Sequence, residues 1–414
     1  MRVKPSSINH SSPHPSIWAL LKNINCTIVL FGTFLMAMGI HLINPIIPEI
    51  ISYFKISELK AGLVISLFTF PTIVLSPIVG GLADKYGYKK FLLIGISIIG
   101  IFGILPVFFN ISFNYLLVIR TMQGIGFATA MPLTIAVLGD LHVGNQETAA
   151  QGMRNFFLSA GGFLFPILGG ALALLGWNYP FICFSLMIPF AFIIYRYLPE
   201  PIKKNNKEPI NLKYFVNGLA GIKDPYIILG IVSSLLRFFI SDGVRFFLPI
   251  FVVMKFTLNL SLVGFMLGFL QIVKTFTALL TGNIVAYLGI KKAFIGGFLM
   301  YGLGCFLIPI VPSVIMLFFL MVILGISDAI LSPIQKSFIT QNTSKKNRGF
   351  YVSILTSMQG IGRTASPIAL GIIMVNFGLY WSFWSMAIIS LIPVFQFLIK
   401  IKGKNITQHK NKSS

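Results

Sequence analysis

Seven ionisable side chains lie inside long apolar stretches of this 414-residue chain, where a charge is costly. They are Arg120, Arg237, Asp242, Arg245, Lys274, Asp328 and Arg363. At about 3 kcal/mol each on an insertion scale, seven charges facing lipid would cost roughly 20 kcal/mol, which excludes lipid exposure. A carboxylate in a low dielectric can exchange protons near neutral pH, and clustered cations attract anions. Asp242 and Asp328 are therefore candidate proton-binding groups, and the excess of cations favours an anionic or zwitterionic ligand.

The spacing of these residues predicts two ion pairs. At roughly 100° per residue, Arg237, Asp242 and Arg245 share one broad helix face, and the last two can pair at i and i+3. Lys274 and Asp328 are expected at matching depth in two apolar segments, so we predict that they pair. The alternative for both acids is a permanent structural role. Four aromatic residues nearby are expected mostly to face lipid, although they could also line an apolar surface: Phe238, Phe246, Phe247 and Tyr301.

Composition indicates the elements that must position these groups. With 56% hydrophobic, 10% charged and 14% aromatic residues, the chain is typical of a polytopic membrane protein. Apolar segments of spanning length begin near residues 27, 59, 91, 113, 149, 179, 226, 259, 292, 314, 350 and 380. Backbone groups in hydrocarbon must be satisfied within the segment, so the segments are expected to be helices. The predicted fold is an all-α membrane protein with twelve transmembrane helices.

An internal duplication divides these helices into two halves. Residues of the first half recur 202 positions later: Gly62, Gly80, Gly87, Lys89, Lys90 and Gly95 return as Gly264, Gly282, Gly289, Lys291, Lys292 and Gly297, and Gly176 and Phe181 as Gly378 and Phe383. We therefore predict two pseudo-symmetric six-helix bundles with a cavity between them. The predicted organisation is an N-terminal tail (1–26), a first bundle (27–198), a linker (199–225), a second bundle (226–400) and a C-terminal tail (401–414). Part of the linker, 211–222, is a candidate interfacial helix.

The 32 Lys and Arg residues indicate an orientation. Most of them, Arg154 among them, fall in the tails or in loops on one side, whereas only Lys55, Lys60 and Lys255 fall in loops on the other. By the positive-inside rule, both termini are expected in the cytoplasm of a cell whose plasma membrane holds the protein. The net charge of +22 then faces anionic lipid, and no nucleic-acid partner is needed.

Three local motifs add detail. The loop after the second segment reads GGLADKYGYKK at 80–90, and the fourth segment contains RTMQGIG at 120–126. In that loop Asp84 is expected to cap a helix start or to pair with a cation, while Gly87 permits a tight turn. The fifth segment spaces Gly and Pro in a pattern that allows close helix packing: Gly152, Gly161, Pro166, Gly169 and Gly170.

On these motifs the chain resembles the major facilitator superfamily, and within it the twelve-span drug:proton antiporter branch, over about 27–400. The resemblance implies that the loop latches the two halves through Gly80, Asp84, Lys85, Gly87, Lys89 and Lys90. It also implies a role for Arg120 in proton coupling. Four positions depart from the family pattern. Tyr88 stands where the family usually has Arg, Phe165 stands where a Gly usually precedes the proline, and Ala286 stands where the second-half copy of the loop would have an acid. Many drug antiporters also place an acid within the first span, whereas here Glu49 lies at the outer end of that span.

These observations predict a secondary active transporter that moves a small organic molecule by alternating access, with proton-coupled efflux as the leading mode. The alternatives are a proton-coupled importer of an organic anion and, more remotely, a non-transporting membrane sensor.

An enzyme is not expected, because no nucleotide-binding loop, nucleophile motif or metal cluster is present. No cofactor or metal is expected, the proton gradient supplies the driving force, and a monomer in the lipid bilayer is predicted. His41 is a further candidate for proton coupling. The candidate substrate contacts are Arg237, Arg245, Lys274, Arg363, Gln123 and Asn44.

Overall fold

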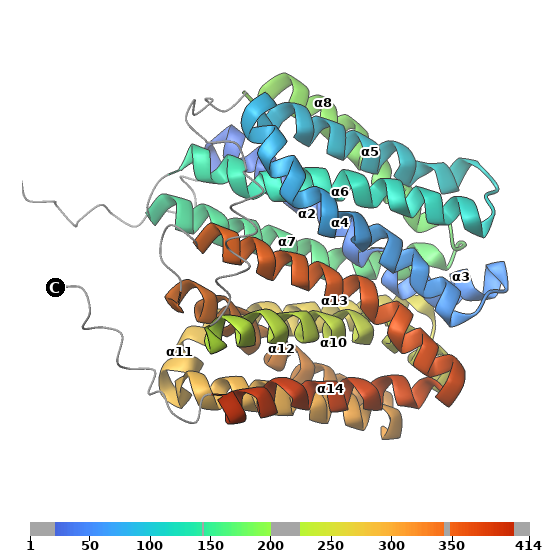
Figure 1. Ribbon diagram of the computed structural model, residues 1–414. Helices are drawn as coiled ribbons and strands as arrows, with labels where there is room; N and C mark the ends of the chain where they lie inside the picture. Colours follow the sequence, from blue (N-terminus) through green and yellow to red (C-terminus); the bar gives the residue numbers. More distant parts are fainter. Residues whose placement is uncertain (1–20, 143–144, 200–223, 343–347, 401–414) are drawn as a thin grey trace, which may run out of the picture.

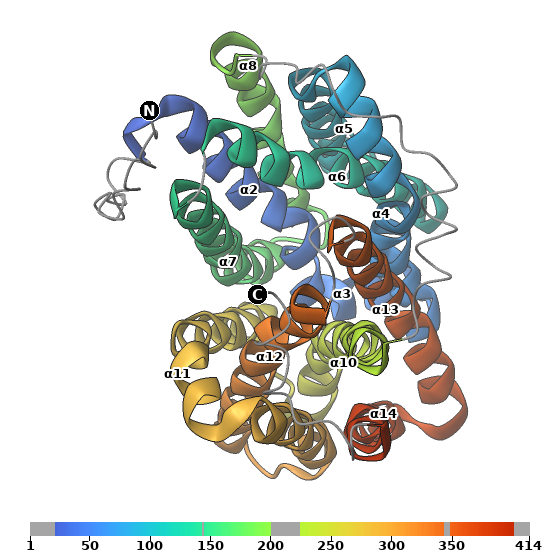
Figure 2. The ribbon, with the colours of Figure 1, turned by 60° about the vertical axis from the view of Figure 1, so that its left-hand side comes forward.

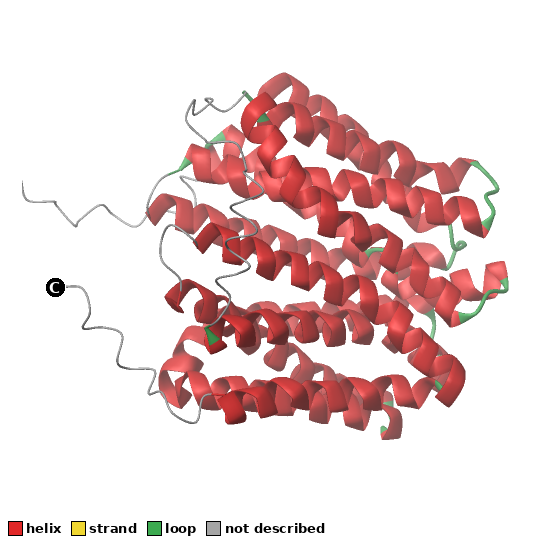
Figure 3. Ribbon diagram, in the orientation of Figure 1, coloured by secondary structure: helices red, strands yellow, loops and turns green. Residues whose placement is uncertain are grey.

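The structure is a computed structural model that describes residues 21–142, 145–199, 224–342 and 348–400, and this part of the chain is helical throughout (Figures 1 and 3). Residues 1–20 of the predicted N-terminal tail, the C-terminal tail, most of the linker and its candidate interfacial helix lie outside the described residues, and the first helix begins at Ile24, inside the predicted tail. The first half contains α2 (Ile24–His41), η1 (Asn44–Ile46), α3 (Ile47–Phe54), α4 (Glu58–Tyr86), α5 (Tyr88–Phe108), α6 (Phe113–Leu141), α7 (Asn145–Ala173), η2 (Tyr179–Leu186) and α8 (Met187–Tyr197). The second half contains α10 (Pro225–Phe256), α11 (Leu260–Leu307), η3 (Ile308–Ile310), α12 (Val314–Asn342), α13 (Arg348–Phe377) and α14 (Leu379–Lys400).

Eleven helical stretches of the described residues are long and apolar enough to cross a membrane. They match the twelve predicted segments, because two of these merge into α11. Its only non-helical backbone is at Gly289 (φ 78°, ψ 151°), where the helix bends between the eighth and ninth segments. In the first half, the equivalent pair of segments forms two helices, α4 and α5, which are separated at Gly87 (φ 102°). The sixth segment begins as a 3₁₀ helix, η2, before it becomes α8.

The repeat is visible in the backbone as well as in the sequence. Each residue of the described ranges with a positive φ has a counterpart 202 positions away. Three such pairs exist: Lys55 and Thr257, Gly87 and Gly289, and Gly176 and Gly378. Left-handed backbone is uncommon for residues other than glycine, so its recurrence at Lys55 and Thr257 marks equivalent turns.

The two halves meet along two pairs of helices. Helix α4 of the first half packs against α13 of the second, and α7 packs against α11. Figure 2 shows α13 beside α4 and α11 beside α7, with α5 and α8 on the outside of the first half and α14 on the outside of the second. We call the side at which α2 and α10 begin the tail side (left in Figure 1), and the opposite side the far side.

In both helix pairs, a glycine of one helix packs against the backbone carbonyl of a proline on the other helix, near the far side. In the α4–α13 seam, a methyl group on Gly62 would lie 3.0 Å from the carbonyl oxygen of Pro367. In the α7–α11 seam, a methyl group on Gly264 would overlap the carbonyl oxygen of Pro166. Gly62 and Gly264 are 202 residues apart, so the two seams repeat one contact. A side chain at either position would hold the backbones apart.

The predicted packing role of the Gly/Pro pattern in α7 is confirmed at three glycines and is wrong at a fourth. Gly161 and Gly169 lie against backbone carbonyls of α2 and the residue after it, and Gly170 lies against the carbonyl of Leu260. Gly152, toward the tail side, has no other atom within 4 Å of its Cβ position. The same is true of Gly80 and Gly282. Close contacts through glycine therefore lie near the far side, and these three glycines toward the tail side make none.

The α7–α11 seam makes a stability prediction. Gly264→Ala should destabilise the protein by about 1–3 kcal/mol, because the added methyl group overpacks the contact with Pro166. Thermal unfolding of the purified protein measures this as a lower Tm. Gly282→Ala is the matched control on the same helix, where the methyl group meets open space and alanine favours the helix. Equal or higher stability of both variants would contradict a tight seam at Gly264.

Candidate functional site

The membrane-embedded charges of the second half form two clusters on α10, α11, α12 and α13. In the first cluster Asp328 of α12 pairs through one carboxylate oxygen with Arg237 of α10 and through the other with Lys274 of α11. Arg237 also donates from Nε to Oε1 of Gln335, at 2.8 Å. The predicted Lys274–Asp328 pair is thus confirmed. Because Asp328 binds cations from two other helices, its charge state affects how α10, α11 and α12 hold together.

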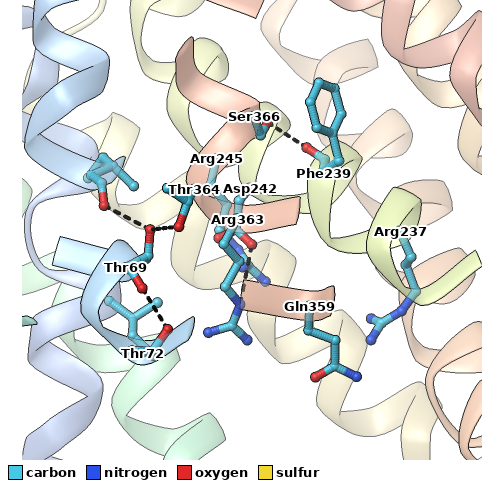
Figure 4. Close-up of polar contacts among 12 residues, drawn as sticks. Thr69, Thr72, Arg237, Phe239, Asp242, Arg245, Gln359, Arg363, Thr364 and Ser366 are labelled. Carbon is cyan, nitrogen blue, oxygen red and sulfur yellow. Dashed lines mark hydrogen bonds and ion pairs between the residues drawn. The ribbon is translucent and has the colours of Figure 1, made fainter. Parts of the chain in front are cut away.

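The second cluster is centred on Asp242 of α10. Its Oδ1 accepts a hydrogen bond of 3.1 Å from Arg245, which confirms the predicted i and i+3 pair. Its Oδ2 faces Nε of Arg363, on α13, at 3.7 Å (Figure 4). That separation is too long for a hydrogen bond, and neither atom has a hydrogen-bond partner among the described residues. The Asp242–Arg363 contact is therefore electrostatic and only loosely made.

The exposure of these side chains separates structural groups from accessible ones. Arg237, Asp242 and Asp328 are buried, whereas 24% of the Lys274 side chain and 26% of the Arg363 side chain are exposed. The prediction that these charges do not face lipid agrees with the ion pairs that six of the seven make. Lys274 and Arg363 present the most accessible cationic surface of the two clusters.

The prediction that the four aromatic residues mostly face lipid is wrong. Phe238, Phe246, Phe247 and Tyr301 are all buried. The Phe238 ring lies beside two guanidinium groups, with its centroid 4.3 Å from Cζ of Arg237 and 4.4 Å from Cζ of Arg363. The negative face of a phenyl ring stabilises cations, so Phe238 partly compensates the charge of both clusters.

In the first half, Arg120 is compensated without an acid. It is fully buried in α6 and donates to the backbone carbonyls of Gly39 and Val64 and to Oε1 of Gln123, at 3.1, 3.1 and 2.8 Å. Its Cζ lies 4.3 Å from the centroid of the Phe68 ring. No carboxylate pairs with Arg120 in the described part of the chain. The arginine therefore joins α6 to α2 and α4.

Three other predicted site residues are buried rather than lining an accessible surface. Gln123 is occupied by Arg120, and the amide of Asn44 donates to the carbonyl of Ile40 at 2.9 Å. His41, at the end of α2, lies next to Gly162 of α7, which also contacts Gln271 of α11. His41 thus sits where the two halves meet.

Arg154 was expected in an inner loop, and the structure corrects this. It is buried within α7, where its Nε donates to the hydroxyl of Thr134, at 2.7 Å, on α6. Helix α7 begins at Asn145, and the start expected near residue 149 already placed Arg154 inside the fifth segment, which is the sequence signal that could have identified it. Three polar residues were also missed, because a single uncharged residue in an apolar helix is common: Gln335, Gln359 and Thr364.

The loop motif is only partly visible. Asp84 lies in the last turn of α4, which ends at Tyr86, so the first of its two expected roles, capping a helix start, is wrong. The turn comes later, at Gly87, and α5 begins directly at Tyr88. The side chains of Asp84 and Lys85 lie outside the described residues. The positive φ of Gly87 confirms the predicted tight turn.

Polar contacts between the halves lie next to the second cluster. Ser66 of α4 donates to the carbonyl of Thr364 at 2.7 Å, and the hydroxyls of Thr69 and Thr364 are 2.9 Å apart. Figure 4 shows Thr364 turned toward α4, and Arg363, its neighbour in sequence, directed toward Asp242. The charged cluster and the α4–α13 seam therefore share adjacent residues of one helix. Among the described residues, no group of His, Cys, Asp and Glu could hold a metal ion.

The chain belongs to the Major Facilitator Superfamily, whose family model matches residues 29–285 and 230–413. The family consists of membrane transporters, not enzymes. The chain is 23% identical to the bacillibactin exporter of Bacillus subtilis over 91% of this chain and 96% of the exporter. It is 24% identical to multidrug resistance protein 1 of the same organism, over 89% and 95% respectively.

Solved structures agree on the fold. The chain is similar to a bacterial homologue of the human lysosomal transporter Spinster, solved in an inward-facing and unoccupied conformation, with a TM-score of 0.75 and 19% identity. The similarity covers 94% of this chain and 97% of that protein. The predicted fold of two six-helix bundles and the predicted family are confirmed, and the protein is a multi-pass membrane transporter.

The Lys274–Asp328 pair makes a testable prediction. Lys274→Ala and Asp328→Ala should each lower the free energy of unfolding, and the double variant should be less destabilised than the sum by about 1 kcal/mol or more. The reason is that each single change leaves a buried charge without its partner. Denaturation of the purified variants in detergent measures the cycle. Strictly additive losses would contradict the pair, and Lys60→Ala with Asp328→Ala is the control cycle, because Lys60 is exposed near the far side.

Proposed function

We propose that this protein is a secondary exporter that uses proton entry to move a small organic molecule across the plasma membrane by alternating access. The observation that carries the proposal is Asp328, a buried carboxylate paired with cations of two other helices inside the second half. Protonation of Asp328 would remove its charge and release Arg237 and Lys274, so proton binding would change the packing of α10, α11 and α12. Asp242 is the second candidate for this role, and Arg120 and His41 are further candidates.

Three further observations support export. Two relatives that align over nearly the whole chain are named as exporters or drug-resistance proteins. Close glycine contacts join the two halves near the far side, whereas three glycines toward the tail side meet no other helix, and this supports a conformation that is closed at the far side. The surplus of Lys and Arg in the tails and in the loops of the tail side favours a cytoplasmic tail side. This conformation would then accept substrate from the cytoplasm.

Import of an organic anion is the alternative, and one observation favours it. Four cations and two acids make up the two clusters of the second half, so a bound anion would be attracted there in either direction of transport. The direction of flux in energised cells distinguishes the two modes.

Energised cells test the proposed coupling. Cells that express the protein should accumulate less of an exported metabolite or drug than cells without it, and an uncoupler should abolish the difference. Asp328→Asn should remove pH-driven flux, because an amide cannot take up the proton. Asp140→Asn, at an exposed acid near the end of α6, is the matched control and should behave as the wild type. Unchanged pH-driven flux in both Asp328→Asn and Asp242→Asn would eliminate these acids as couplers.

The loop between α4 and α5 is proposed to latch the halves during the cycle. Asp84→Asn should therefore slow turnover and leave substrate affinity nearly unchanged, since only the movement between conformations depends on the latch. Rates of efflux over a range of substrate concentrations separate the two quantities. A large loss of affinity with unchanged maximal rate would be the opposite of what a latch predicts. Lys60→Gln, on the far side, serves as the control for a change of surface charge.

A further inference from the structure

Among the cations of the two clusters, Arg363 is the one that the protein satisfies least. Arg237 and Arg245 each donate a hydrogen bond to a carboxylate oxygen, and Lys274 pairs closely with Asp328. Arg363 has only the long approach of 3.7 Å to Asp242, and its buried Nε has no hydrogen-bond partner among the described residues. A buried donor without a hydrogen-bond partner destabilises the folded protein, so the presence of this one calls for an explanation.

The acceptor opposite Arg363 is also unsatisfied. Oδ2 of Asp242 is buried and has no hydrogen-bond partner in the described ranges, although the other oxygen is held by Arg245. Nε of Arg363 and Oδ2 of Asp242 face each other without a hydrogen bond, so both atoms remain available to hydrogen-bond a ligand. A guanidinium presents a planar fork of donors that matches a carboxylate, which an ammonium does not.

The surroundings of Arg363 suit an organic anion. The Phe238 ring stacks beside the guanidinium at 4.4 Å and offers an apolar surface, and 26% of the Arg363 side chain is exposed. On the same helix, one turn earlier, Gln359 donates its amide to Ser234 of α10 at 3.0 Å. An apolar surface with a few convergent polar groups is typical of small-molecule sites.

We propose that Arg363 binds the carboxylate of an organic anion as substrate, and that Asp242 occupies this position in the empty protein. The proposal rests on the proposed transport function and names its substrate class. The anion displaces Oδ2 of Asp242 from the front of the guanidinium, while Arg245 keeps Oδ1. No bond is made or broken other than these ionic contacts, and Asp328 remains the proton-coupling group of the separate first cluster.

The position of Arg363 also connects binding to the opening of the far side. The next residue, Thr364, makes the polar contacts of the α4–α13 seam with Ser66 and Thr69. A carboxylate bound to Arg363 therefore acts one residue away from the contacts that must break for the far side to open. Arg363 is in this sense both a substrate contact and a neighbour of the seam.

Benzoate is the probe, because it combines a carboxylate with a ring of the size of Phe238, and benzamide is its uncharged match. The purified full-length protein in lipid nanodiscs should show a Tm that rises with benzoate concentration and stays constant with benzamide. Arg363→Lys should weaken benzoate binding about tenfold through loss of the planar fork, and Arg363→Gln should abolish it. Lys60→Gln, far from the site, should bind benzoate as the wild type does.

Asp242→Asn separates binding from a purely structural role of Arg363. It removes the competing carboxylate, so benzoate should bind more tightly than to the wild type, whereas loss of a structural ion pair alone would not improve binding. Equal effects of benzoate and benzamide on the wild type would overturn the proposal, as would unchanged benzoate binding by Arg363→Gln. This assay uses no proton gradient. If the anion site is absent, benzoate does not raise the Tm, whereas if only proton-driven export is wrong, benzoate still raises the Tm and the uncoupler has no effect on accumulation in cells.

Discussion

The cost of placing charge inside a membrane organises this protein. Each buried cation must find a carboxylate, a carbonyl, a hydroxyl or an aromatic ring, and the two halves supply different partners. In the second half, Asp328 and Asp242 serve as acceptors for cations on α10, α11 and α13. In the first half, Arg120 relies on backbone carbonyls and Gln123. Among the described residues, the ion pairs that a proton or an anion can rearrange lie in the second half.

The duplication accounts for the scaffold, and divergence accounts for the chemistry. Equivalent turns retain positive φ at Lys55 and Thr257, and equivalent glycines close the two seams at Gly62 and Gly264. These positions are set by backbone geometry, which tolerates little change. The side chains of the clusters have no such restriction. Carriers of this architecture need symmetric halves to alternate between two sides, but they need only one set of titrating and binding groups.

The two clusters divide the work in the mechanism proposed here. Asp328 holds three helices of one half together, so its charge state acts within that half. Asp242 and Arg363 bridge α10 and α13, and α13 is also the helix that contacts the other half through Thr364. Proton binding and substrate binding thus act on neighbouring but separate contacts. In this mechanism Arg363 faces the carboxylate of Asp242 when the site is empty and the carboxylate of the substrate when the site is occupied. Its charge is therefore compensated in both states, which lowers the free-energy cost of releasing the substrate.

The amino-acid sequence was enough to predict the helices, the repeat, the seven embedded charges and two of their ion pairs. Long apolar segments and the spacing of Asp242 and Arg245 follow from local geometry, so they need no knowledge of the fold. The contacts between distant helices came from the packing of the chain: Arg237 with Asp328 and Gln335, Arg363 with Asp242, and the burial of Arg154 and the four aromatic residues. The reason is that hydropathy distinguishes lipid from water but does not distinguish lipid from a protein interior. Both are apolar, and only the packing of one helix on another separates them.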